Sequence, residues 1–341
     1  MDLKQQKKTK AKKSREPAQR KLSGLLALDF AQSGIKAVRL KKAKGQISLS
    51  AVDILPPLNP DEEEKPVLPK ALSAYYTSIC INPAEARLRV FSRVLAGEDH
   101  VEQIARETLG VSEEFRTAGR VLAQGGAKTE SSILGVAIPE QALKQHLELF
   151  AEGAPAPHSL ELSGLAAFSA FMFNRGKQTA NQSICLIEAG RSHTYVAFFH
   201  KNRLQVLNRF DIGGEVLQKK VEDALGVDEE MARTILSDGS VDVSAPVRSA
   251  LASFVKQLSI YREYVERQNK SPLSGVYLSG DEAASPHWQN AIQEVLSLVP
   301  VVWNPFDKLD VPEGAYPENL KGQESRFAAA VGAALGGMEA V

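Results

Sequence analysis

An apolar strand that ends in a carboxylate and a small polar turn gives this chain its clearest chemical pattern. Residues 25–28 are apolar, Asp29 follows them, Gln32 and Ser33 lie in the turn, and Lys36 belongs to the next strand. Consecutive backbone N–H groups in such turns bind phosphate oxygens, and a carboxylate beside them can hold a metal-bound water. We therefore expect Asp29, Gln32, Ser33 and Lys36 to form one half of a nucleotide site. The alternatives are a hairpin cap for Asp29 and an exposed strand position for Lys36.

The same pattern occurs a second time in the middle of the chain. Residues 184–187 are apolar, Glu188 follows them, Gly190 lies in a small polar turn, and Thr194 begins the next strand. About 160 residues separate the two copies, which predicts two related domains that face each other across a nucleotide. Asp29 and Glu188 are then the candidate catalytic residues, and both would hold magnesium through water. We expect Gly190 and Thr194 to contact phosphate.

A pair of glycines stands directly before a predicted helix in the second half of the chain. Gly213 and Gly214 precede the helix expected at residues 216–225. Free N–H groups and the helix dipole make such a position suitable for an anion, so both glycines are nucleotide-binding candidates. Ordinary turn chemistry explains the two glycines equally well.

Length and composition indicate a globular protein of two domains with a separate basic tail. The chain has 341 residues, of which 43% are apolar and 24% charged, and 41 basic residues balance 41 acidic ones. A chain of this length corresponds to about two domains. Residues 1–21 hold nine basic and two acidic residues, so the remainder holds 32 basic and 39 acidic ones. The neutral average therefore conceals a basic tail on an acidic body.

The basic tail is expected to be disordered because it is poor in aromatic and aliphatic residues. Residues 1–21 could contact anionic lipid, and a solvated tail without a partner is the alternative. The body shows no basic groove, so nucleic acid is not an expected partner. The apolar stretch 22–28 is too short for a secretory segment, and no run approaches the length of a membrane span. We expect a cytoplasmic protein.

Cysteine and tryptophan positions point to packing and not to metal chemistry. Cys80 and Cys185 lie in strand-like surroundings without a second cysteine at CxxC spacing, so buried thiols are expected. Trp288 and Trp303 are expected to pack in cores. The six histidines are scattered without carboxylates at ligand spacing.

Strand and helix patterns alternate along the whole body. Between two longer halves, strand, helix, strand and helix follow one another over residues 82–157, which predicts a small α/β insert. A glycine-rich segment at 123–128 lacks P-loop spacing and is interpreted as a hairpin connection. The acidic run 61–64 is interpreted as a solvated loop. Strands are expected at 22–54, 87–91, 131–138, 184–210, 276–280 and 301–303, and helices at 67–76, 98–109, 140–151, 160–173, 216–225, 226–270 and 327–335.

The order of these motifs resembles the actin-like ATPase fold, and within it the type IV pilus assembly protein PilM and the cell-division protein FtsA. The resemblance covers about residues 22–341 and depends on six segments in order: 28–38, 188–194, 207–214, 278–280, 304–306 and 327–336. It implies an α/β, ribonuclease H-like duplicated fold of two domains with an insert in the first. The implied divisions are the tail 1–21, a first domain 22–177 with the insert 82–157, a second domain 178–319 with a helical insert 226–270, and a terminal helix 320–341 packing on the first domain.

Departures from the family pattern weaken the predicted nucleotide site. Ala31 stands where the first turn of the family has glycine, and Glu188 stands where the second turn has aspartate. Gly280 corresponds to the adenosine turn, but Asp281 and Glu282 follow it where small residues are the pattern. Like charges in a poorly screened cleft repel one another. We therefore expect weak or lost binding of ATP and magnesium.

Three functions fit the resemblance. The first is a PilM-like cytoplasmic scaffold at the inner membrane, which binds a short cytoplasmic peptide of a PilN-like partner in a groove formed with the insert 82–157. The second is an active ATPase that uses Asp29 and Glu188 to position magnesium and water. The third, a filament former like FtsA, lacks a basic amphipathic stretch in residues 336–341. The scaffold is the favoured hypothesis, an enzyme is not, and a homodimer is possible on the same resemblance.

Overall fold

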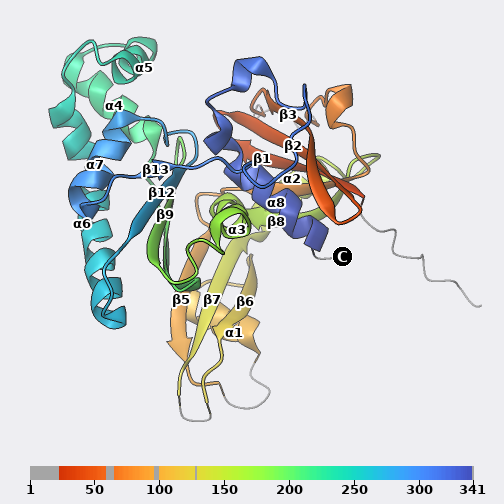
Figure 1. Ribbon diagram of the computed structural model, residues 1–341, viewed down its shortest axis with the longest axis horizontal. Helices are drawn as coiled ribbons and strands as arrows, with labels where there is room; N and C mark the ends of the chain where they lie inside the picture. The colour runs from red at the N-terminus through yellow and green to blue at the C-terminus, as the bar shows by residue number, and fades with distance from the viewer. Residues whose placement is uncertain (1–22, 59–64, 96–99, 127–128, 340–341) are drawn as a thin grey trace, which may run out of the picture.

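Two five-stranded sheets with the same strand pattern form the framework of the protein (Figure 1). The computed structural model describes residues 23–58, 65–95, 100–126 and 129–339. The first sheet has the order β3-β2-β1-β4-β8 and the second the order β11-β10-β9-β12-β13. The strands are β1 (Gly24–Ala31), β2 (Gly34–Ala43), β3 (Gln46–Leu55), β4 (Tyr76–Ile81), β8 (Ala156–Leu162), β9 (Ser183–Ala189), β10 (Thr194–His200), β11 (Arg203–Phe210), β12 (Gly275–Ser279) and β13 (Val301–Val302).

Each sheet begins with three antiparallel strands and continues with parallel ones. β1 pairs antiparallel with β2 and parallel with β4, whereas β9 pairs antiparallel with β10 and parallel with β12. The predicted duplicated α/β fold is therefore confirmed. The central strands β1 and β9 are buried almost throughout, as their unbroken apolar runs require for sheets that are covered on both faces.

Two helices of small residues cover the first sheet. α3 (Ser163–Arg175) packs against α8 (Ala328–Glu339), and α8 in turn contacts β1, β2 and β4. The helices approach so closely that a Cβ atom at Gly332 would overlap the backbone carbonyl oxygen of Ala166. This contact explains why the terminal helix is composed of alanine and glycine. It also ties a segment near residue 330 to the core formed by residues near 30.

Four helices pack together on the second sheet, where Figure 1 shows them gathered on one side. They are α4 (Gly214–Leu225), α5 (Glu229–Asp238), α6 (Ser244–Asn269) and α7 (Pro286–Leu296). Their core is aromatic, since the Phe254 ring lies edge-on to both Phe210 and Trp288. The predicted packing roles of Trp288 and Trp303 are confirmed, because both are buried. Cys80 and Cys185 are buried free thiols, as expected.

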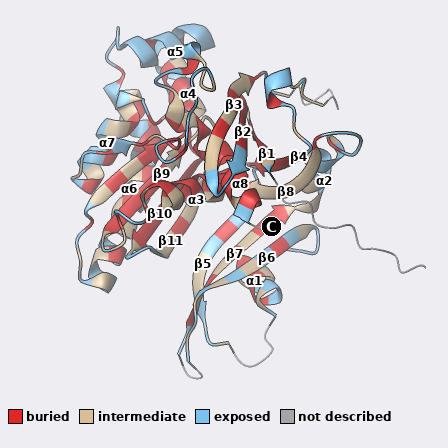
Figure 2. Ribbon diagram, turned by 45° about the vertical axis from the view of Figure 1, so that its right-hand side comes forward, coloured by how far each residue is buried: buried red, intermediate tan, exposed pale blue. Residues whose placement is uncertain are grey.

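A three-stranded sheet projects from the framework between the two halves (Figures 1 and 2). It has the order β5-β7-β6, with β5 (Arg87–Arg93), β6 (Phe115–Ala123), β7 (Ser131–Pro139) and α1 (Val101–Leu109). Helix α2 (Glu140–Glu148) then leads back toward the first sheet, where His146 contacts Phe30 edge-on at 5.3 Å between ring centroids. The predicted hairpin connection at 123–128 joins β6 to β7, although residues 127–128 lie outside the described part.

Two predicted helices and two strands differ between the sequence-based prediction and the structure. The helix expected at 67–76 is a single 3-10 turn at Lys70–Leu72, because Pro66 and Pro69 remove backbone donors and β4 already begins at Tyr76. The helix expected over 226–270 is interrupted, since Gly239 adopts a left-handed conformation that ends α5. Strands β6 and β8 were not predicted at all. β8 joins the first sheet, so the projecting sheet itself ends with β7.

No helix in the described residues is both long and apolar enough to cross a membrane. The expectations for the basic tail 1–21 and for the acidic run 61–64 fall on residues outside the described part, so both stay predictions.

Candidate functional site

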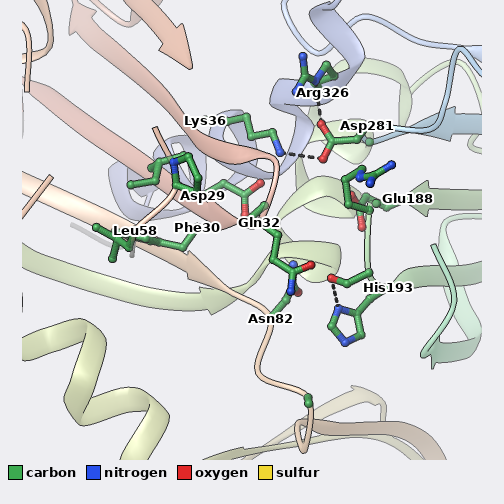
Figure 3. A pocket seen from close by; sticks show the side chains of 18 of the residues that line it. Asp29, Phe30, Gln32, Lys36, Leu58, Asn82, Glu188, His193, Asp281 and Arg326 are labelled. Atoms are coloured by element: carbon green, nitrogen blue, oxygen red, sulfur yellow. Dashed lines mark hydrogen bonds and ion pairs between the residues drawn. The ribbon is translucent and has the colours of Figure 1, made fainter. Parts of the chain in front are cut away.

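A cavity of about 360 Å³ lies between the two sheets, and both predicted carboxylates line it (Figure 3). Asp29 comes from the end of β1, and Glu188 comes from the end of β9. Because the two sheets have the same topology, equivalent strand ends face each other across this space. The structure therefore places Asp29 and Glu188 in one shared crevice. Its volume lies within the range of small-molecule sites.

Asp29 is held in place from the first half of the molecule. Its carboxylate accepts a hydrogen bond of 2.5 Å from the Ser163 hydroxyl at the start of α3. Only 6% of Asp29 is exposed, and burial raises the pKa of its carboxyl group, against the opposing effect of the Lys36 ammonium. A cap of the hairpin is thus not its only role, because its side chain bonds to a helix 134 residues away.

Glu188 faces Asp29 with a carboxyl group that holds its proton. Burial raises the pKa of Glu188 from its ordinary value of 4.5 to about 8, and the nearby Asp29 and Asp281 carboxylates add to this effect. Metal ligands must be deprotonated, so magnesium would first have to displace this proton. No group of three potential ligand residues converges anywhere in the described part of the chain. Magnesium usually takes only one or two protein carboxylates beside waters and phosphates, so the proton on Glu188, and not the lack of a third ligand, is what opposes a magnesium site here.

Lys36 points into the crevice, where it forms a buried ion pair. Its ammonium nitrogen lies 2.8 Å from Asp281 Oδ2, and only 2% of its side chain is exposed. The Ser33 hydroxyl donates to the same oxygen at 2.5 Å, and Arg326 Nε donates to Asp281 Oδ1 at 2.7 Å. Burial alone would raise the pKa of Asp281, but Lys36 and Arg326 hold that pKa below its usual range.

The negative charge expected near the adenosine turn is partly compensated at Asp281, although it still raises the pKa of Glu188. Two cations and a hydroxyl compensate its charge, and Figure 3 shows both ion pairs. Glu282 is also paired, since its Oε1 lies 3.6 Å from Arg191 Nη1. Burial nevertheless raises the pKa of Glu282, with Arg191 opposing the rise. Both acidic residues therefore have cationic partners within the chain, and only Asp281 lines the crevice.

In the turn between β9 and β10, the Thr194 hydroxyl and the Gly190 N–H form hydrogen bonds within the chain. The Thr194 hydroxyl donates to the Ile212 carbonyl at 2.7 Å, and Thr194 is fully buried. Thr194 does not line the crevice, which leaves its hydroxyl unable to reach a phosphate there. The Gly190 N–H donates to the His193 carbonyl at 2.9 Å. The cavity is lined by Gly190 and by the next three residues of the turn, Arg191, Ser192 and His193.

The start of α4 is closed by other parts of the same chain. The Gly214 N–H donates to the Gly190 carbonyl at 3.2 Å, and the Glu215 N–H donates to the Arg191 carbonyl at 2.9 Å. A Cβ atom at Gly214 would overlap the Glu282 carboxylate. Gly213 and Gly214 are therefore needed for close packing, and a carboxylate of the chain already occupies the helix start.

The sequence pattern found part of this crevice and missed another part. Asp29, Gln32, Lys36, Glu188, Gly190 and Gly280 line the cavity, and Ser33 reaches it through Asp281. Thr194, Gly213 and Gly214 do not line it. The residues that pattern reasoning missed are Asn82, His146, Arg191, His193 and Arg326. The one available signal was that Arg326 is the last charged residue before an apolar helix.

A second hollow, more apolar than the crevice, lies where the projecting sheet meets α3 and the β10–β11 hairpin. Its volume is about 680 Å³. We call it the insert groove and define it by its lining: Leu122, Ala123, Ser132, Leu134, Leu165, Phe168, Ser169, Met172, Phe173, Phe199, Asn202, Arg203, Leu204, Gln205 and Glu339. On α3, Ser169 is exposed and its neighbours Leu165 and Met172 are half-buried. The resemblance to the PilM family implied a groove formed with the insert 82–157 but identified none of these residues as its lining.

Comparisons with known proteins agree with the fold. The family model described as type IV pilus assembly protein PilM matches residues 164–338. Among solved structures, a PilM-PilN type IV pilus biogenesis complex matches with a TM-score of 0.77 and 16% identity, over 94% of this chain and 99% of that chain. No curated protein matches the sequence.

Two further solved structures are more distant. A Bacteroides thetaiotaomicron protein with an actin-like ATPase fold and unknown function gives a TM-score of 0.46 at 10% identity, over 83% of this chain and 91% of that one. The ethanolamine utilization protein EutJ from Carboxydothermus hydrogenoformans gives 0.43 at 12% identity, over 92% and 89%.

Proposed function

This chain belongs to the type IV pilus assembly protein PilM family, and from that membership we propose that it is an assembly scaffold which binds a short cytoplasmic peptide of an inner-membrane partner. The insert groove is the observation that carries this proposal. The similar solved structure contains PilN as the partner of PilM, which supports a PilN-like partner here. Binding to such a partner would hold the protein at the cytoplasmic face of the inner membrane.

The chemistry of the insert groove favours an extended peptide with apolar side chains. Its walls come from three separate elements, and Leu134, Leu165, Met172 and Leu204 supply half-buried apolar surface. Burial of apolar surface stabilises a complex by about 25 cal/mol for each Å² removed from water. Asn202 and Gln205 also line the groove, and their side-chain oxygens can accept hydrogen bonds from a peptide backbone.

Weak or lost nucleotide binding is the second part of the proposal. The support is that Asp281 already occupies Lys36 and Arg326, and that the first N–H groups of α4 donate to Gly190 and Arg191 carbonyls. Calorimetry with ATP and magnesium tests this part. Absent or millimolar binding agrees with a scaffold, whereas micromolar binding with hydrolysis would favour the active ATPase.

A single substitution in the insert groove tests the peptide proposal. Ser169→Arg places a long charged side chain in the groove without removing any core residue, because Ser169 is exposed on α3. The matched control is Ser253→Arg, which changes an exposed serine on α6. The probe is the labelled cytoplasmic N-terminal peptide of the PilN-like protein encoded beside this chain, measured by fluorescence anisotropy.

We expect Ser169→Arg to weaken peptide binding at least about tenfold, which corresponds to a loss of about 1.4 kcal/mol. Ser253→Arg should bind like the unchanged protein. Equal binding by both variants would show that the peptide does not use the insert groove. The basic tail remains a predicted lipid contact, and sedimentation on anionic vesicles with and without residues 1–21 tests it.

A further inference from the structure

We propose that Asp281 is a built-in anion that takes the place of a nucleotide phosphate and ties the two halves of the molecule together. This inference rests on the proposed weak nucleotide binding and goes beyond it. It says that the crevice stays closed because the chain supplies its own negative charge. The protein would then keep one closed shape without a ligand.

The contacts of Asp281 join three distant parts of the chain. Asp281 follows β12 in the second sheet, whereas Ser33 and Lys36 belong to the β1–β2 hairpin of the first sheet. Arg326 lies in the 3-10 turn Glu324–Phe327, which leads directly into α8 on the first sheet. One carboxylate thus accepts hydrogen bonds from both ends of the first half. Figure 3 shows Lys36 and Arg326 approaching it from two directions.

The surroundings of Asp281 have the chemistry of an anion site. Two cations and one hydroxyl donate to its two oxygens at 2.5–2.8 Å. Such charge-assisted bonds are shorter and stronger than neutral ones. The turn is also shaped for close approach, because Gly280 has a φ of +95° and its N–H donates to the Ser325 carbonyl at 3.0 Å. Removal of the carboxylate would leave the donors of an oxyanion site without their acceptor.

Other side chains cross the crevice in parallel with Asp281. With its amide group turned over, the orientation that satisfies both of its ends, the Gln32 side-chain nitrogen donates to Glu215 Oε2 at 3.0 Å. The Tyr195 hydroxyl donates to Asn82 Oδ1 at 2.9 Å, and Arg209 donates to the Ala84 carbonyl at 2.9 Å. Each bond joins a group of the first half or its insert to the second half. Of these cross-links, the Asp281 contact is the one that pairs a nearly buried carboxylate with two cations.

Rescue by a small anion tests whether Asp281 acts as a phosphate substitute. The full chain and its Asp281→Ala and Asp307→Ala variants are unfolded by heat at matched ionic strength, with and without inorganic phosphate. Asp307→Ala is the control, because it breaks the half-exposed ion pair with Arg175 at 2.7 Å outside the crevice.

We expect Asp281→Ala to lower the midpoint of unfolding by about 10 °C, since it leaves a buried cation without its partner. Phosphate should restore at least about half of this loss, because it can bind the Lys36, Arg326 and Ser33 donors that have lost their acceptor. The unchanged protein and Asp307→Ala should gain only the small general effect of phosphate. Equal gains in all three proteins would overturn the proposal.

A second variant covers the case in which Asp281→Ala does not fold. Asp281→Asn keeps the side-chain volume but removes the negative charge, so the crevice should open and the radius of gyration in small-angle X-ray scattering should increase. A radius identical to that of the unchanged protein would refute the proposal. Neither readout involves the partner peptide, so failure here is distinguishable from failure of peptide binding.

Discussion

The interdomain crevice and the insert groove differ in the groups that they enclose, and helix α3 contributes to both. In the crevice, charged groups are buried and find partners within the chain, as Lys36 does with Asp281. In the insert groove, apolar groups such as Leu165 and Met172 remain half-buried without being covered by the described residues. α3 belongs to both regions, because Ser163 bonds to Asp29 while Ser169 lines the groove.

This difference separates residues that hold the molecule together from residues that are free to bind another one. A buried charge that loses its partner carries a large penalty, so changes in the crevice should act on stability. An exposed position beside apolar surface contributes little to folding, so changes in the groove should act on binding alone. We therefore expect losses in the free energy of unfolding to be largest for changes in the crevice and smallest for changes in the insert groove.

The largest loss in the free energy of unfolding should come from Lys36→Met in the crevice. The substitution leaves the Asp281 carboxylate, 9% exposed, without its most buried cation. Breaking such a pair costs about 3–5 kcal/mol, which urea unfolding measures directly. Lys219→Met is the matched control, because Lys219 is 67% exposed and pairs only on the surface of α4. Similar unfolding midpoints for both variants would remove the distinction between crevice and surface.

A change at the contact between α8 and α3 should have the next largest effect on the free energy of unfolding. Gly332→Ala would place a methyl group against the Ala166 backbone and push α8 away from α3. We expect a loss of about 3 kcal/mol in the free energy of unfolding. Gly336→Ala on the same helix meets only the end of the Glu161 side chain, at 3.2 Å. This control should be neutral or stabilising, and equal losses would contradict the close packing.

Because Glu188 is protonated in the folded chain, the free energy of unfolding should depend on pH. A carboxyl whose pKa is about 8 in the folded chain and 4.5 otherwise binds an extra proton when folded. Its stabilising contribution is complete below pH 4.5 and is lost as the pH rises through 8. Between pH 6.5 and 8.5 the free energy of unfolding should therefore fall by about 2 kcal/mol.

Glu188→Gln isolates this contribution, because the variant cannot release a proton there. Glu161, whose pKa burial raises to about 7, contributes in the same direction and remains in both proteins. His193, whose pKa burial lowers to about 4, acts mainly below pH 6.5. Urea unfolding at a series of pH values should give a flatter profile for Glu188→Gln, and parallel profiles would show that Glu188 is ionised in the folded chain.

The smallest effect on stability should come from the insert groove. Ser169→Arg is expected to change the free energy of unfolding by less than about 0.5 kcal/mol, although it should abolish most peptide binding. Chemical denaturation of the variant measures this. A loss as large as that of Lys36→Met would mean that the groove is part of the folding core and not a free surface.

The sequence was sufficient to predict the duplicated fold and the facing strand ends. Unbroken apolar runs that end in Asp29 and Glu188 report local backbone structure, and short-range patterns of this kind are readable in a sequence. The pairing of Lys36 with Asp281 was not readable, because 245 residues separate the two. Thr194 was misjudged for a related reason, since its hydroxyl bonds to the carbonyl of Ile212 on a neighbouring segment.

Helix predictions failed where single residues outweighed the general pattern. Pro66 and Pro69 removed donors from the expected helix at 67–76, and Gly239 ended α5 inside a stretch that otherwise favours helix. Strand β8 was missed because its mixed sequence, with Pro157 and His158, shows no clear alternation. In each case tertiary pairing or one backbone-restricting residue decided the outcome.

Because α8 packs on β1, the first sheet can be completed only at the end of translation. The first sheet acquires its covering helix only when residues 328–339 have been translated, about 300 residues after β1 is translated. The second half, with its own aromatic core, has no such delay. The nascent amino-terminal half therefore exposes apolar surface until α8 is made, and such surface makes a chain prone to aggregation during synthesis.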